Sequence, residues 1–144
     1  MKIISRMISF LSFVFIGCST VKIYEKYGEE TELVDNNRSK ILIEKFTAFD
    51  KNKSFLTFTS DFNNLITVKN GDSLVFNKKR KTLSMLGFTD GCIILNNKDV
   101  MITIDKRQDI KLNKEQLSKY KFIYIAKEKN HYTIEYTNRA ISFL

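Results

Sequence analysis

Short apolar runs, in which apolar and polar residues alternate, recur along most of the chain and are separated by polar turns. They are rich in β-branched and aromatic residues, and alternation with a period of two is typical of strands with one buried face. Roughly nine such runs follow residue 40, at 41–46, 55–59, 65–69, 73–76, 82–86, 92–95, 100–104, 121–126 and 132–136. An earlier strand is predicted at 21–27, and a last apolar segment closes the chain at 140–144. The spacing of about ten residues predicts an all-β fold, a small antiparallel β-sandwich of roughly eight to nine short strands.

Two segments depart from the strand pattern. Asn70-Gly71 lies between two apolar runs, and this pair predicts a tight hairpin because Gly, and to a lesser degree Asn, adopts the positive φ that such a turn requires. Residues 112–120 suggest at most two helical turns, with Asn113 as the cap, although a loop fits this segment equally well.

The N-terminus has a different pattern. Lys2 and Arg6 precede an uncharged stretch of eleven residues, 7–17. As a helix this stretch rises about 16 Å, which is too short for a hydrocarbon core of about 30 Å. A positive start, a short apolar segment and small residues predict a signal peptide rather than a transmembrane anchor.

The end of this segment, Phe15-Ile16-Gly17-Cys18, resembles the lipobox of bacterial lipoproteins, although Phe15 replaces the more common Leu. The resemblance implies cleavage between Gly17 and Cys18 and acylation of Cys18, with palmitate-type chains as the membrane anchor. Ser19 follows where Asp commonly marks inner-membrane retention, which implies the outer membrane. The alternatives are an ordinary cleaved signal, in which Cys18 is incidental, and a short uncleaved anchor.

These observations divide the chain into a signal peptide at 1–17, a lipidated Cys and tether at 18–40, and a β-sandwich domain at 41–144. The mature chain of 127 residues (144 − 17) is long enough to bury a single core. The tether is expected because residues 19–40 carry mixed charges and the polar turn cluster 35–39.

The chain carries 24 Lys and Arg residues against 16 Asp and Glu residues, for a net charge of +8. Four of these cations are consecutive, at Lys78, Lys79, Arg80 and Lys81, and we expect them to follow a strand. They could meet anionic headgroups, lipopolysaccharide phosphates or an acidic partner, or simply discourage edge-to-edge strand pairing. Nucleic acid is not an expected partner, because aromatic residues are not interleaved with these cations.

The chain contains few groups for catalysis or metal binding. The single His, His131, falls in a predicted hairpin turn, and Cys92 opens an apolar strand where a thiol behaves as a small hydrophobe. With one His and two Cys, neither a zinc cluster nor any other metal site or cofactor is predicted. Tyr124, Tyr132 and Tyr136 could stack on a sugar, but Ile134 shares a face with the last two and favours burial of that face.

The sequence therefore predicts a non-catalytic envelope lipoprotein whose β-sandwich is a binding or structural module. Its partners would be the membrane, through the lipid, and an envelope protein or glycan. Two alternatives remain, namely a periplasmic inhibitor or immunity-type lipoprotein that binds a toxin or hydrolase and, less favoured, a hydrolytic enzyme.

Overall fold

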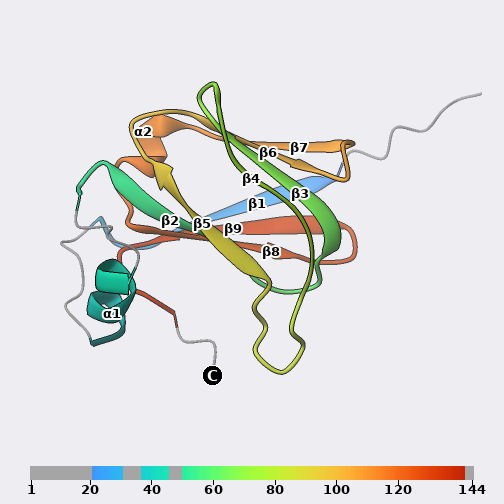
Figure 1. The fold of residues 1–144 in the computed structure, drawn as a ribbon, viewed down its shortest axis with the longest axis horizontal. Coiled ribbons are helices and arrows are strands. Elements are labelled where there is room, and N and C mark those ends of the chain that lie inside the picture. The colour runs from blue at the N-terminus through green and yellow to red at the C-terminus, as the bar shows by residue number, and fades with distance from the viewer. Residues whose placement is uncertain (1–20, 31–36, 46–49, 142–144) are drawn as a thin grey trace, which may run out of the picture.

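The computed structural model describes residues 21–30, 37–45 and 50–141, so the predicted signal peptide and the lipobox with Cys18 lie outside the described residues. The described part of the chain is mostly β, with nine strands in two sheets and two short helices (Figure 1). The predicted all-β sandwich is thus confirmed, and its main apolar core lies between the two sheets.

The first sheet has five strands in the order β1-β9-β8-β2-β5. Their bounds are Lys22–Tyr27 for β1, His131–Thr137 for β9, Phe122–Lys127 for β8, Lys53–Phe58 for β2 and Asp90–Leu95 for β5. The β8–β9 and β2–β5 pairs are antiparallel, whereas the β1–β9 and β2–β8 pairs are parallel. Antiparallel pairing was predicted throughout, and the parallel pairs arise because the partners are far apart in sequence and need no hairpin.

The second sheet has four strands in the order β4-β3-β6-β7, all antiparallel. Their bounds are Ser73–Lys81 for β4, Asn63–Asn70 for β3, Val100–Ile104 for β6 and Gln108–Leu112 for β7. The predicted hairpin is confirmed, because Asn70 pairs with Ser73 and Gly71 has a φ of +59°. The Asn70-Gly71 pair between two apolar runs was enough to locate this turn.

The core contains a group of phenylalanines contributed by both sheets. Phe58 of β2 lies edge-on to Phe62, with ring centroids 5.5 Å apart, and its ring centroid is 6.0 Å from that of Phe76 of β4. All three side chains are buried. The sandwich therefore depends on aromatic contacts that join the two sheets.

The first helix corrects the sequence analysis. A strand was predicted at 41–46, but the chain forms helix α1 at Asn37–Lys45. Ile43 is buried in a second apolar cluster with Phe55 and Phe122, whereas Ile41 is 59% exposed. Short apolar runs fit either period, and here the contact of Ile43 with this cluster outweighs the local alternation.

Residues 82–86 also differ from the prediction of a strand. Strand β4 continues to Lys81, and the chain then forms a loop, 82–89, that contains a single bridge between Leu83 and Phe88. Gly87 has a φ of +60° and closes the turn inside this loop. The apolar residues of 82–86 suit a strand, but no neighbouring strand of the described residues lies beside them to supply the backbone hydrogen bonds, apart from the bridge to Phe88.

Helix α2, Lys114–Leu117, lies within the segment where a short helix was expected. Asn113 occupies the cap position, but its side chain makes no capping hydrogen bond. The backbone N–H of Lys114 instead donates to Asp99 Oδ1 at 2.9 Å. In the described ranges no helix combines the length and the apolar character needed to cross a membrane.

Strand β1 confirms the early strand predicted at 21–27, and it is an edge strand of the five-stranded sheet. It pairs in parallel with β9, and the Tyr27 ring stacks on Tyr136 with centroids 5.0 Å apart. The Tyr136 hydroxyl donates to Glu25 Oε1 at 3.2 Å. Part of the predicted tether is therefore built into the five-stranded sheet.

Candidate functional site

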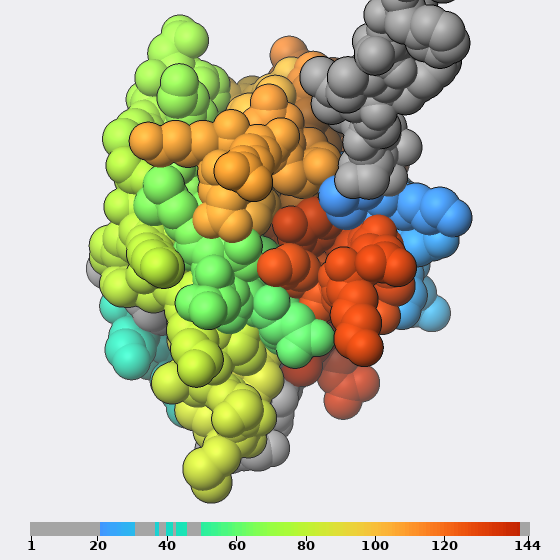
Figure 2. Space-filling view, turned by 90° about the vertical axis from the view of Figure 1, so that its right-hand side faces the viewer, coloured from blue at the N-terminus to red at the C-terminus, as the bar shows by residue number. Residues whose placement is uncertain are grey.

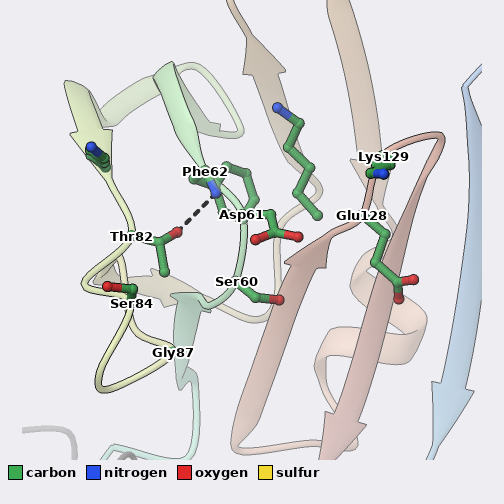
Figure 3. A pocket seen from close by; sticks show the side chains of 10 residues that line it. Ser60, Asp61, Phe62, Thr82, Ser84, Gly87, Glu128 and Lys129 are labelled. Carbon is green, nitrogen blue, oxygen red and sulfur yellow. Dashed lines mark hydrogen bonds between the residues drawn. The ribbon is translucent and has the colours of Figure 1, made fainter.

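A shallow cleft of about 620 Å³ lies where three connecting segments meet (Figure 3). The turn between β2 and β3 contributes Ser60, Asp61 and Phe62. The end of β4 and the following loop contribute Lys81, Thr82, Ser84 and Gly87, and the β8–β9 connection contributes Lys127, Glu128 and Lys129. The lining thus contains three lysines, two carboxylates and three hydroxyl groups.

Hydrogen bonds hold the wall of the cleft that belongs to loop 82–89. The Thr82 hydroxyl accepts from the backbone N–H of Phe62 at 2.8 Å and lies 2.7 Å from the Thr89 hydroxyl. Both hydroxyls contact the backbone carbonyl of Thr59. The two ends of the loop are therefore attached to the β2–β3 turn.

The opposite wall of the cleft is held by a network of side-chain hydrogen bonds that starts at Lys127. Its Nζ donates to Asn64 Oδ1 at 2.9 Å, and the Asn64 amide donates in turn to the carboxylate of Asp105. Partial burial opposes ionisation of Asp105, but the hydrogen bonds from Asn64 and from the backbone N–H of Leu65 lower its pKa overall. The Lys127 ammonium group is therefore engaged in this hydrogen-bond network.

The two carboxylates of the cleft come from different turns, and one of them has a partner. Glu128 Oε1 lies 3.1 Å from His131 Nε2. Asp61 has a φ of 61°, a left-handed conformation that Asp tolerates in turns. This arrangement suits the binding of a polar or charged group at the surface better than acid–base chemistry, which needs a positioned base and an orienting group.

The structure divides the predicted basic run into two pairs. The run lies within β4, not after a strand as predicted. Arg80 Nε donates to Asp90 Oδ2 of β5 at 2.5 Å, and Lys78 Nζ lies 5.5 Å from the centre of the Phe76 ring. Lys79 and Lys81 are exposed, and of the four residues Lys81 lines the cleft.

Loop 82–89 presents apolar side chains to solvent directly after the basic run. Met85 is 95% exposed, Leu83 is 56% exposed and Leu86 is 41% exposed. The turn is closed by hydrogen bonds from the N–H groups of Leu86 and Gly87 to the carbonyl of Leu83, at 2.9 and 3.0 Å. Figure 2 shows the yellow-green segment that contains this loop projecting beyond the body at the bottom of the view. This exposed loop was not predicted from the sequence, where the glycines at 87 and 91 are the signal that marks a break in the strand pattern.

His131 and the tyrosines are built into the five-stranded sheet. His131 begins β9 and is half-buried, not at a turn tip as expected, and its ring lies 5.0 Å from the ring of Tyr24. The parallel pairing with β1 covers it, which the sequence did not indicate. Tyr132, Ile134 and Tyr136 share one buried face as predicted. Tyr124 is buried too, so these tyrosines form no exposed surface for a sugar.

Cys92 lies against the core, as predicted. Burial, with a smaller contribution from the Asp90 carboxylate, raises the pKa of the Cys92 thiol to about 12. The thiol therefore stays protonated and unreactive in the folded protein at neutral pH.

We expect an aromatic disulfide reagent to modify Cys92 at least about a hundredfold more slowly in the folded protein than in denaturant, because the thiolate is the nucleophile. The rate of thiolate release measures this difference. The exposed control is Ser84→Cys in a Cys92→Ala background, which should react equally fast in both conditions. Fast modification of folded Cys92 would contradict the expectation.

Within the described part of the chain, no group of three or more His, Cys, Asp or Glu residues is arranged to hold a metal ion. The chain matches no protein-family model, no curated protein and no solved structure.

Proposed function

We propose that this protein is a non-catalytic lipoprotein of the cell envelope, anchored through acylated Cys18 in the outer membrane. Its β-sandwich would act as a binding module at the membrane surface. The observation that carries the proposal is the position of Cys18, at the end of an apolar leader and four residues before Lys22, where β1 begins.

The short link between Cys18 and β1 determines how the module would be held. Four residue steps span at most about 14 Å even when fully extended. Strand β1 is paired with β9 along its whole length, from Lys22 with His131 to Tyr27 with Tyr136. An acylated Cys18 would thus keep the folded body against the bilayer rather than at the end of a long tether.

The surface available for binding is the end of the sandwich formed by the cleft and loop 82–89. It presents exposed lysines, hydroxyl groups and exposed apolar side chains close together. Binding sites commonly lie on loops carried by a stable scaffold. This composition supports binding of a surface or partner rather than chemical conversion of a substrate.

The proposal is tested by replacing Cys18 with Ala and following the chain with a fatty-acid label and by mass spectrometry. The wild-type chain should begin at residue 18 and carry acyl chains, whereas Cys18→Ala should take up no label and keep the peptide bond between positions 17 and 18 intact. Cys92→Ala is the matched control and should behave as the wild type. An unmodified sulfur at residue 18, or a native chain that still begins with Met1, would refute the proposal.

A further inference from the structure

We propose that loop 82–89 inserts its apolar tip into the interface of an anionic phospholipid bilayer, with Lys79 and Lys81 against the headgroups. The loop would then be a second membrane attachment beside the lipid on Cys18. This inference rests on the proposed anchoring, which makes the bilayer the surface that the body always faces.

The tip has the composition of an interfacial anchor. None of the eight loop residues is charged, and Leu83, Met85 and Leu86 expose their side chains together. A large apolar side chain that is 95% exposed, like Met85, has no role in the core of the sandwich. Transfer of such side chains out of water is favourable in the acyl-chain boundary of a membrane.

The charges beside the tip favour an anionic surface. Lys79 and Lys81 are exposed at the end of the strand that leads into the loop. The acidic residue that follows the loop, Asp90, is already paired with Arg80 and does not offset these lysines. Each Lys close to an anionic bilayer tightens binding by about fivefold, and salt weakens this effect.

The loop is also pre-organised for insertion. Its turn is closed by the hydrogen bonds to the Leu83 carbonyl, and its two ends are attached through Thr82 and Thr89 to the β2–β3 turn. Little conformational entropy is then lost when the tip enters the bilayer. The N–H groups of Leu86 and Gly87 are already bonded inside the loop, which lowers the cost of moving this part of the backbone out of water.

The position of the anchor supports contact of the loop with the same membrane. The β8–β9 turn faces the base of the loop across the cleft, and His131, which follows that turn, pairs with Lys22. The start of β1 and the base of the loop therefore flank one turn. With the acyl chains inserted, contact of the loop becomes an intramolecular event with an effective concentration in the range of about 1 mM or more, so weak affinity suffices.

The test uses a Trp reporter, because the natural chain contains no Trp. The full-length lipoprotein carrying Met85→Trp is reconstituted in vesicles of phosphatidylglycerol and phosphatidylcholine whose acyl chains are brominated. We expect blue-shifted emission and strong quenching. The matched control is Leu74→Trp, since Leu74 is 57% exposed at the opposite end of the same strand, and its emission should remain unquenched.

The lysines are tested in the same assay. Replacing Lys79 and Lys81 by Ala should reduce the ratio of inserted to free Met85→Trp reporter by about fivefold for each lysine. Lys69→Ala with Lys98→Ala, two exposed lysines near the other end of β4, should leave it unchanged. Equal quenching in purely neutral vesicles would overturn the role assigned to the lysines.

Failure of this inference is distinct from failure of the anchor. The mass of the protein reports acylation of Cys18, whereas the quenching of the reporter reports the depth of the loop however the chain is attached. An acylated protein in which Met85→Trp and Leu74→Trp are equally unquenched would overturn the inference and leave the anchor intact. Shielding of the Met85→Trp reporter by a bound protein, with no quenching by brominated lipid, would overturn it as well.

Discussion

Replacing Phe58 by alanine is expected to lower the free energy of unfolding by about 3–5 kcal/mol, the range for removal of a fully buried phenylalanine. Phe58 has no exposed surface and contacts Phe62 of the β2–β3 turn and Phe76 of the other sheet. Its loss leaves a cavity that the two sheets cannot close without shifting. Urea denaturation followed by circular dichroism measures the change.

The control for this substitution is Leu74→Ala. Leu74 is apolar too, but its side chain is largely exposed at the tip of the β3–β4 hairpin, so we expect a change within about 0.5 kcal/mol. If both variants lost the same stability, Phe58 would not be the core residue described here. A Phe58→Leu variant, which restores part of the volume, should recover part of the loss.

Asn70→Ala is expected to lower the free energy of unfolding by about 1–3 kcal/mol, because a buried side chain loses its two hydrogen bonds to Leu95. The Asn70 side chain is buried and joins the two sheets. Its amide donates to the Leu95 carbonyl at 3.0 Å, and its Oδ1 accepts from the Leu95 N–H at 2.6 Å. The substitution would leave the Leu95 N–H without its acceptor and the Leu95 carbonyl with only the N–H of Lys98, at 3.3 Å. Thermal unfolding followed by calorimetry measures the loss.

Asp72→Ala is the matched control, because Asp72 lies in the same turn and is exposed. Its replacement should change stability by less than about 0.5 kcal/mol. If Asn70→Ala were equally mild, the link between the sheets would contribute nothing, and Asn70 would matter only for the conformation of the turn. Asn70→Asp separates the two explanations, since Asp suits the turn but cannot donate to the Leu95 carbonyl.

Asn70 shows how far sequence reasoning extends. The Asn70-Gly71 pair located the hairpin because the turn depends on backbone conformations that these two residues favour locally. The Asn70 side chain also makes two hydrogen bonds to Leu95, which lies 25 positions away in the sequence. No local pattern reports such a contact.

The candidate site illustrates the same limit. The cations at 78–81 were visible in the sequence, but only the structure shows that Arg80 pairs with Asp90, that Lys78 lies over the Phe76 ring, and that Lys79 and Lys81 are exposed. The apolar residues at 83–86 were predicted as a strand, and the structure presents them as an exposed loop. Alternation of residue types reports which side chains suit a strand, but not whether a partner strand is available.

Sequence patterns alone were enough to predict the all-β class, the hairpin at Asn70-Gly71, the packing of Cys92 against the core and the shared face of Tyr132 and Tyr136. These follow from side-chain periodicity and from backbone preferences that act over a few residues. Long-range contacts were needed to make 37–45 a helix, to add β1 to the sheet beside β9 and to leave loop 82–89 outside the body. Those outcomes depend on contacts between segments distant in the chain, whose energies exceed the local preferences.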